Sequence, residues 1–430
     1  MAQRRESHIR RELTRLISPQ LIRARARKLG AVKRRRKVDV VALVYTLVLG
    51  FGSGRRRTLA GLRRAYALAT GTTLAPSAFQ GRFTPELAEM MRQLSERAFA
   101  RLECGKGRLQ MALRAFRRVF VADGSLVRLG DALQDDYPSV WTNHMKASAK
   151  LHLVIDALKR TPVITRVLAG STHDLRAMTV DSRVRGALLV FDLAYYQGDL
   201  FQSIIDAGGA FLCRVKRDAN FHILHASDAR LMGLKTKDAA RTMQGRDWEC
   251  TVDYRYRRIR ERDWTWRHVR LRLIAIWHTD QRRHRLYLTS VPDSKLAASD
   301  APAIYAMRWE IELLFRELKS QLRANEMPSA NKAAVEILIY ASLLALAVAR
   351  TLHRLLAERR RGVLEPCPLE RWTTVVRHLA HALLQLLLAP PPDRWSLGCR
   401  IATVLRHEGL DPNFGRLHLT ARAQLGLMAR

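Results

Sequence analysis

The spacing of apolar and polar positions divides this chain into helical ends and a strand-rich middle. From about residue 8 to 118, apolar positions recur at helical spacing and predict three or four short helices, one of them strongly apolar at 40–49. Short runs rich in β-branched residues begin at 116, and helical spacing returns from about 312 to 388. The pattern therefore predicts a mixed α/β fold with helical N- and C-terminal regions.

The strand-rich middle predicts one mixed sheet of five strands. The predicted strands lie at 119–125, 150–156, 162–168, 187–191 and 210–215. The first three predict a meander, and helices are predicted at 174–184 and 199–207, on either side of the fourth strand. This order of strands and helices is typical of an α/β sheet.

Two of the predicted strands end in an acid. Asp123 closes the first strand and Asp192 closes the fourth. Ligands bind at the carboxyl ends of strands in α/β sheets, and two neighbouring carboxylates can hold divalent cations. A single strand-end aspartate is more often a turn or cap residue. A pair at matching ends of adjacent strands is harder to explain in that way, so these acids are candidate metal ligands.

Four polar residues are spaced along one predicted helix. Tyr305, Arg308, Glu312 and Lys319 are separated by three, four and seven residues. At about 3.6 residues per turn, these steps keep the side chains on one stripe, with a carboxylate between two cations and a phenol. The stripe predicts a phosphate-handling face around one metal-binding acid. The alternative is a solvated amphipathic helix that carries chance charge.

Residues 216–300 predict a mainly β insertion between the fifth strand and the helix of Glu312. The stretch is rich in arginine and tryptophan and has strand-like runs at 268–278 and 284–291. Interleaved tryptophans and arginines suit stacking on unpaired bases and contact with phosphates. Tryptophans at alternating spacing are also common in hydrophobic cores, so both roles stay open.

The net charge indicates a polyanionic partner, and nucleic acid is the leading candidate. The chain carries 75 Lys and Arg against 39 Asp and Glu, which gives a formal charge of +36 and a pI near 11.2. The first 118 residues hold 28 of the basic residues and 7 of the acidic ones, and hence +21 of that charge. Basic clusters at 23–28, 33–37 and 55–57 predict an N-terminal DNA-binding region. A helical bundle with a solvated basic face is the alternative.

Cysteines and apolar runs indicate the cellular setting. The five cysteines lie far apart without a Cys-x-x-Cys pair, which argues against disulfides and a structural zinc site. No apolar signal region follows the N-terminus, and the apolar runs at 40–51 and 333–352 predict buried helices and no membrane span. A reducing, cytoplasmic setting is expected.

The helix motif and the two strand ends together resemble a known family. The spacing Tyr-two-Arg-three-Glu-six-Lys, with Asp123-Gly124-Ser125 and Asp192-Leu193-Ala194-Tyr195, resembles the DDE transposases of bacterial insertion sequences, in the insertion-sequence-four (IS4) group. The resemblance covers about residues 116–345, including Lys150-Leu151-His152 and His173-Asp174. One departure is Ala194, where the family usually has glycine, so a tighter or shifted turn is expected there.

The resemblance implies a ribonuclease-H-like catalytic core that is interrupted by the β insertion. On this basis the chain divides into a helical DNA-binding region, the first part of the core, the insertion, the second part of the core and a helical C-terminal region, at 1–115, 116–215, 216–300, 301–350 and 351–430.

The resemblance also implies roles for the candidate residues. Asp123, Asp192 and Glu312 would form an acidic triad that holds two Mg²⁺ ions, or Mn²⁺ in their place, with Asp123 bridging both. Arg308, Lys319 and Tyr305 would hold DNA phosphates near the cut. The freed 3′ hydroxyl would attack the opposite strand to make a hairpin, while Trp264 or Trp266 stacks on a flipped base.

The function implied by the resemblance is transposition by a homodimer that holds two double-stranded ends of its own element and joins them to target DNA. A nuclease or recombinase of the same fold, which cuts without joining, is one alternative. A non-catalytic DNA-binding remnant is another. The presence of all three acids favours an enzyme over a remnant.

Overall fold

Two compact units interleave along the chain. The computed structural model describes residues 8–32, 38–54, 58–102, 113–140, 145–216, 218–257, 266–320, 322–323, 327–359 and 369–409. The helical unit comprises Met1–Cys104, Val127–Ala149 and Phe315–Arg430, and the sheet unit comprises Gly105–Leu126 and Lys150–Leu314. The basic clusters at 33–37 and 55–57 lie outside the described residues, and the predicted segment boundaries stay a prediction.

The helical unit holds more N-terminal helices than the three or four that the sequence predicts. These helices are α1 (His8–Leu16), α2 (Pro19–Lys28), α3 (Val40–Thr46), α4 (Leu59–Thr70), α5 (Pro76–Gln80) and α6 (Pro85–Leu102), and a π-helical stretch, η2 (Leu47–Gly52), continues α3. Polar caps divide them, because Ser18 and Thr58 accept hydrogen bonds from the first-turn N–H groups of α2 and α4. Most of these helices span only two or three turns, which is too short for periodicity to separate them.

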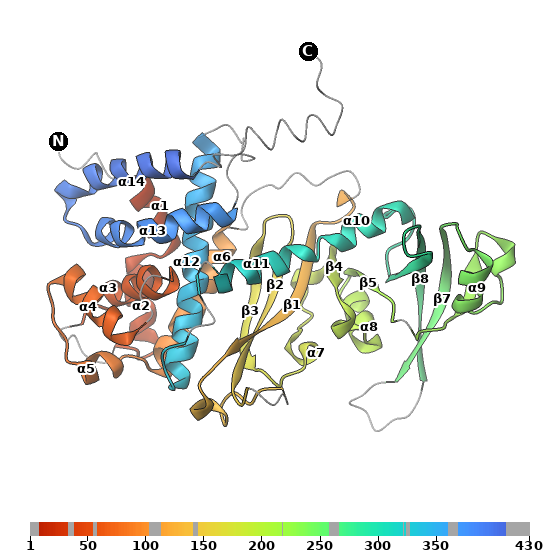
Figure 1. Ribbon diagram of the computed structural model, residues 1–430, viewed down its shortest axis with the longest axis horizontal. Coiled ribbons are helices and arrows are strands. Elements are labelled where there is room, and N and C mark those ends of the chain that lie inside the picture. Colours follow the sequence, from red (N-terminus) through yellow and green to blue (C-terminus); the bar gives the residue numbers. More distant parts are fainter. Residues whose placement is uncertain are drawn as a thin grey trace, which may run out of the picture. The chain divides into compact units, whose positions relative to one another are not determined.

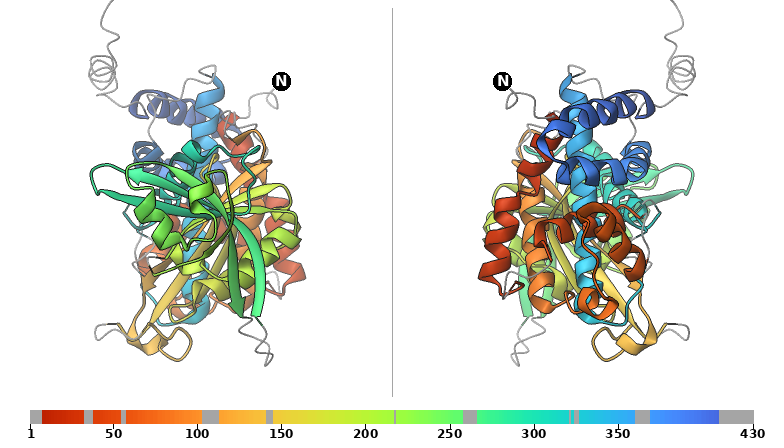
Figure 2. Two further views of the ribbon diagram at one scale, coloured as in Figure 1. Left: turned by 90° about the vertical axis from the view of Figure 1, so that its right-hand side faces the viewer. Right: turned by 90° about the vertical axis from the view of Figure 1, so that its left-hand side faces the viewer.

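A long apolar helix, α12 (Lys332–Arg359), forms the centre of the helical unit. The helices α1, α6, η2 and α13 (Leu369–Leu388) pack against it, and α14 (Arg394–Glu408) packs on α13 (Figures 1 and 2). Gly52 allows η2 to approach closely, because a Cβ there would collide with the carbonyl oxygen of Ala341. By length and composition Lys332–Leu355 would suffice to cross a membrane, but 89% of its apolar window is buried inside the fold. The predicted buried helix is therefore confirmed.

The sheet unit is organised around one sheet with the strand order β3-β2-β1-β4-β5-β9-β8-β7-β6. The strands are β1 (Arg118–Arg128), β2 (Ser148–Asp156), β3 (Thr161–Ala169), β4 (Ala187–Phe191), β5 (Ala210–Arg214), β6 (His222–Ala226), β7 (Trp248–Arg257), β8 (Trp266–His278) and β9 (Arg283–Thr289). β1, β4 and β5 run parallel, while β9 pairs antiparallel with β5 (Figure 1). The predicted mixed five-stranded sheet is confirmed, and the β insertion extends the same sheet.

Two predicted elements differ from the structure. β1 does not end at Asp123 but continues to Arg128. The helix predicted at 174–184 is a single turn, α7 (Asp174–Ala177), and a separate 3₁₀ turn follows at Ser182–Val184. The β-branched Thr179 and Val180 disfavour a continuous helix, and Asp181 caps the later turn by accepting the N–H of Arg183 at 2.9 Å.

The helix predicted to carry the Tyr-Arg-Glu-Lys stripe is also interrupted. α10 (Ala301–Ala306) ends after Tyr305, and α11 (Trp309–Ser320) begins after Arg308. Tight i to i−3 hydrogen bonds join them, from the N–H of Arg308 to the carbonyl of Tyr305 at 3.0 Å and from Ile311 to Arg308 at 3.3 Å. Because residues three apart eclipse each other in a 3₁₀ turn, Tyr305 and Arg308 still share one face.

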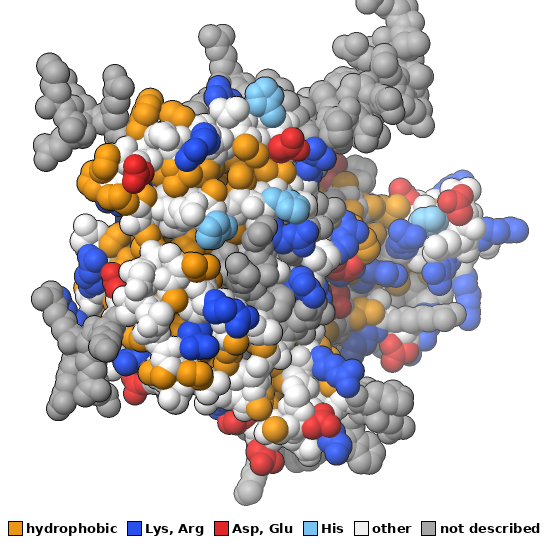
Figure 3. Space-filling model, turned by 60° about the vertical axis from the view of Figure 1, so that its left-hand side comes forward, with side chains coloured by type: hydrophobic (Ala, Val, Ile, Leu, Met, Phe, Trp, Pro, Cys, Tyr) orange, Lys and Arg blue, Asp and Glu red, His pale blue; other side chains and the backbone are white. Residues whose placement is uncertain are grey.

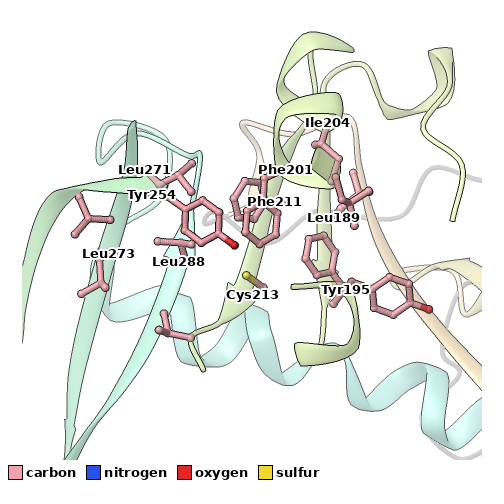
Figure 4. Close-up of a cluster of buried hydrophobic side chains, with 14 of the residues drawn as sticks. Leu189, Tyr195, Phe201, Ile204, Phe211, Cys213, Tyr254, Leu271, Leu273 and Leu288 are labelled. Carbon is pink, nitrogen blue, oxygen red and sulfur yellow. The ribbon is translucent and has the colours of Figure 1, made fainter. Parts of the chain in front are cut away.

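One hydrophobic core joins the predicted core strands to the insertion. Figure 4 shows Phe211 of β5 beside Phe201 of α8 (Gly198–Asp206), with Tyr254 of β7 and Leu288 of β9 in the same cluster. The rings of Phe201 and Phe211 stack with centroids 4.3 Å apart. Each such side chain contributes about 1.5–3 kcal/mol when buried. This packing fixes the carboxyl ends of β4 and β5.

Candidate active site

The register of the sheet places Asp123 and Asp192 side by side. β1 and β4 pair in parallel, and Val121 is the partner of Val190. Asp123 and Asp192 each lie two residues beyond that pair. Side chains alternate along a strand, so two residues at equal steps project from the same face, about 4.8 Å apart between strands. The sequence predicted this pairing from strand ends, and the prediction holds although β1 continues past Asp123.

Asp123 is a partly buried carboxyl in an acidic environment. Burial raises the pKa of Asp123 to about 6, a hydrogen bond from the N–H of Gly124 opposes this rise, and the charge of Asp192 adds to it. The guanidinium of Arg308 lowers the same pKa, whereas the charge of Asp174 raises it. Asp123 therefore ionises more readily when a further cation is supplied, as a metal ion would do.

Asp192 is held by the turn that follows β4. Its Oδ1 accepts the N–H of Ala194 at 2.8 Å and caps a 3₁₀ turn, Leu193–Tyr195. Among the described residues, the only non-glycine residues with positive φ are Arg160, Arg282 and Arg323. Ala194 therefore occupies a conformation open to any residue. Glycine is not required here, and the turn forms normally despite the departure from the family pattern.

Tyr195 connects this turn to β2, which lies two strands away in the sheet order. Its side chain is fully buried, and its hydroxyl lies 3.0 Å from Nε2 of His152 on β2. Burial lowers the pKa of His152 to about 4, so the imidazole is neutral at pH 7. The pair links the turn after β4 to β2, on the other side of β1, without adding charge.

Arg308 joins the third acid to the first two. Its Nη1 lies 2.5 Å from Oε1 of Glu312, one helical turn along the chain. Burial alone would lower the pKa of Arg308, but Glu312, Tyr305 and Asp192 together raise it. Tyr305 belongs to the same group, since burial raises the pKa of Tyr305 to about 12 while Arg308 and Arg214 oppose the rise. The structure thus brings together five of the predicted site residues: Asp123, Asp192, Tyr305, Arg308 and Glu312.

Lys319 lies near the end of α11, beyond the point where the chain passes into the helical unit. It is half-buried, and burial lowers the pKa of Lys319 below its ordinary value. The shared helix keeps its predicted spacing from Glu312. A contact between Lys319 and the acids stays a prediction.

The acids do not form a closed metal cage. Across the described parts of the chain, no three His, Cys, Asp or Glu side chains gather closely enough to hold an ion. Glu312 is instead turned to Arg308. The oxygen donor set still fits a hard divalent cation, because the charges of the neighbouring carboxylates of Asp123 and Asp192 repel each other.

Trp266 lies apart from the acids in the order of the sheet. Trp264 is outside the described residues. Trp266 opens β8, which is four strands from β1 in the sheet order, so roughly 19 Å separates the two strands sideways at about 4.8 Å per strand. Trp266 is 48% exposed, and the guanidinium carbons of Arg255 and Arg257 lie 5.1 and 4.2 Å from its ring centroid. It is a surface residue rather than part of the core.

Two residues near the acids, Arg214 and Trp309, were not predicted from the sequence. Arg214 ends β5 and lies level with Asp192, because Phe191 pairs with Cys213 in the parallel register. The sequence could have indicated Arg214, because it lies near the end of the fifth predicted strand, which follows the fourth strand along the chain. Trp309, the residue after Arg308, is 55% exposed.

The helical unit carries a separate basic groove that the sequence did not single out. Four arginines line it, from α1 and from the end of α6, together with the start of α2: Arg10, Arg11, Arg15, Arg101, Thr14, Ser18, Pro19 and Gln20. Its volume is about 450 Å³. Figure 3 shows Lys and Arg side chains scattered among hydrophobic and uncharged ones on one face. The positive N-terminal end of α2 adds to the attraction for an anion.

Comparisons with known proteins show the family of this chain. Residues 114–348, more than half of the chain, match the family described as transposase DDE domain. The transposase for insertion sequence element IS231B of Bacillus thuringiensis subsp. berliner is 20% identical over 369 residues, which is 78% of this chain and 77% of that protein. The transposase for IS231F of subsp. israelensis has the same identity and coverage. The cryo-EM structure of the piggyBac transposase synaptic complex with hairpin DNA is a looser likeness, with a TM-score of 0.44 and 8% identity over 91% of this chain and 84% of that chain.

Proposed function

This chain belongs to the DDE transposases, and on that premise we propose that it cuts DNA at the ends of its own insertion sequence and joins the freed ends to a target. Asp123, Asp192 and Glu312 are the proposed catalytic acids. The observation that carries this assignment is the parallel register that sets Asp123 beside Asp192, with the pKa of Asp123 raised by burial and by the charge of Asp192. Family membership makes the chain an enzyme of DNA transposition.

Divalent metal ions are the cofactor of this family's chemistry. We propose two Mg²⁺ ions, with Mn²⁺ as a substitute, held by Asp123, Asp192 and Glu312. Ions held there would supply positive charge to the attacking and leaving oxygens of an in-line displacement at phosphorus. With a pKa of about 6, Asp123 is already largely ionised at neutral pH, which is the form in which a carboxylate binds a metal ion.

Arg308 can pair with the carboxylate of Glu312 or with a phosphate of DNA. Without metal or DNA, its guanidinium holds Glu312 at 2.5 Å. We propose that Arg308 leaves this carboxylate for a DNA phosphate when Glu312 takes up its ligand role. Arginine suits this task because its planar fork matches carboxylate and phosphate oxygens equally well. Tyr305 and Lys319 are proposed to hold neighbouring phosphates.

The N-terminal region is proposed to grip the element ends, and the arginine groove of α1, α2 and α6 is the best-supported place for it. Its charge and its size suit the phosphate backbone of duplex DNA. We further propose that a homodimer holds two ends in the cytoplasm and that each end passes through a hairpin. Trp266 would stack on a flipped base, and the exposed Trp309 is a second candidate nearer to Glu312.

A plasmid that carries the gene with its native flanks tests this proposal. Purified protein is incubated with it in Mg²⁺, in Mn²⁺ and in chelator, and the products are separated on native and denaturing gels. Metal-dependent excision followed by joining to a second plasmid supports transposition. Cutting without joined product would support the nuclease reading. Binding to the flanks with no cut in either metal would support a DNA-binding remnant.

A further inference from the structure

Gly124 follows Asp123 directly, and its missing side chain leaves room for another acid. A Cβ on Gly124 would collide with Oδ1 of Asp174 and would lie 3.2 Å from Cδ of Lys150. Gly124 is not among the glycines with positive φ, so its backbone does not demand glycine. Space for Asp174 is therefore the reason for glycine at this position.

Asp174 is held in that space by Lys150. The Nζ of Lys150 lies 3.2 Å from Oδ1 of Asp174 and donates to the carbonyl of Thr172 at 2.5 Å. The two side chains are 11% and 22% exposed, so water screens them little. Lys150 belongs to β2, the neighbour of β1, and Asp174 opens α7. The ion pair thus joins two separate elements over the backbone of Gly124.

We propose that the Lys150–Asp174 pair positions Asp123 by fixing the peptide of Gly124. The N–H of Gly124 donates to Oδ1 of Asp123 at 2.7 Å, so a shift of this peptide turns the carboxylate. Residues that orient a metal ligand from behind are usually worth about 10- to 100-fold in metal affinity or activity. The inference rests on the proposed function, since that function makes Asp123 a metal ligand.

Three variants test the arrangement: Gly124→Ala, Asp174→Ala and the double variant. Mn²⁺ affinity is measured by titration calorimetry on the DNA-free protein, and cleavage of the element ends is measured alongside. Gly124→Ala is expected to lower both by about 10- to 100-fold, because the new Cβ pushes the peptide away from Asp174. Asp174→Ala is expected to lower both as well. The double variant is expected to be no worse than Asp174→Ala, since the Cβ then has room.

Asp181→Ala is the matched control. Asp181 lies in the same segment and pairs with Arg183 at 2.5 Å, but both side chains are well exposed, at 39% and 45%. Its removal is expected to leave Mn²⁺ affinity and cleavage unchanged. Losses that multiply in the double variant, or normal Mn²⁺ affinity in Gly124→Ala, would overturn the positioning role.

Asp192→Asn distinguishes a failure of the positioning inference from a failure of the proposed transposase function. If Asp192→Asn is inactive and Gly124→Ala behaves as wild type, the positioning inference fails and the transposase assignment stands. If Asp192→Asn still cleaves, the catalytic assignment itself fails. Circular dichroism on each variant guards against loss of fold, which would lower the unfolding temperature as well as metal affinity.

Discussion

Replacing Asp123 by asparagine should stabilise the metal-free protein while abolishing its chemistry. Burial and the charge of Asp192 raise the pKa of Asp123 from its usual 3.8 to about 6. A carboxyl whose pKa is higher in the folded state than in the unfolded state destabilises the fold once it ionises. Asparagine carries no charge and still offers an oxygen to the N–H of Gly124. The variant therefore avoids the cost and keeps the hydrogen bond.

The size of the effect follows from the shift of about 2 units, at about 1.4 kcal/mol for each. At pH 7.5 Asp123→Asn should be more stable than wild type by roughly 3 kcal/mol, and at pH 5 by roughly 1–2 kcal/mol. Near pH 4 the gain should fall below about 1 kcal/mol, because Asp123 is then protonated in the folded state and only about half ionised in the unfolded state. The gain is thus nearly absent below about pH 3, grows through the unfolded pKa of about 3.8 to the folded pKa of about 6, and is nearly constant above about pH 7.

Urea unfolding of both proteins in chelator, at these three pH values, measures the difference directly. Mg²⁺ at about 100 times its Kd should then stabilise wild type by about 2.7 kcal/mol and the variant by less. A variant that is less stable than wild type at pH 7.5 without metal would refute the reasoning. So would a difference that does not change with pH.

Three further predictions concern other parts of the chain. Glu312→Gln should lose cleavage by about 100-fold or more while Glu310→Gln, a neighbour on α11 that pairs with Arg160, keeps it; gel assays on end DNA compare them. Arg350→Ala should lower the free energy of unfolding by about 3–5 kcal/mol, because it leaves the buried carboxylate of Glu317 without its guanidinium partner. Urea unfolding of wild type and variant measures this difference. Arg101→Ala should weaken binding to DNA of any sequence and reduce the slope of log affinity against log salt by about 1, as fluorescence anisotropy would show; an unchanged slope would exclude the groove.

The sequence predicts the elements whose signals are local. β4 runs from Ala187 to Phe191 as predicted, because five consecutive buried apolar residues are bounded by a glycine and an acid. The pairing of Asp123 with Asp192 was also within reach, since strands that end in acids meet at one edge of a sheet. The helix at 174–184 failed because three β-branched residues, Thr179, Val180 and Val184, weaken a pattern that hydrophobic spacing alone favours.

The sequence did not predict the features that depend on contacts between distant residues. The space over Gly124 is filled by Asp174, fifty residues later, and no local pattern announces that contact. The four arginines of the basic groove come from both ends of the N-terminal region, so they do not form a cluster in the sequence, unlike the basic residues at 23–28 and 33–37. The break between α10 and α11 has no proline or glycine to mark it.

Strand cleavage by Asp192→Asn at the element ends tests the central claim most directly. Wild type and variant are compared on end-labelled DNA in Mg²⁺, and anisotropy with the same DNA confirms that both bind. The account predicts nicks at the element end with wild type, none with the variant, and similar affinity for both. A variant that binds and nicks as wild type does would show that the strand-end acids are not the catalytic centre.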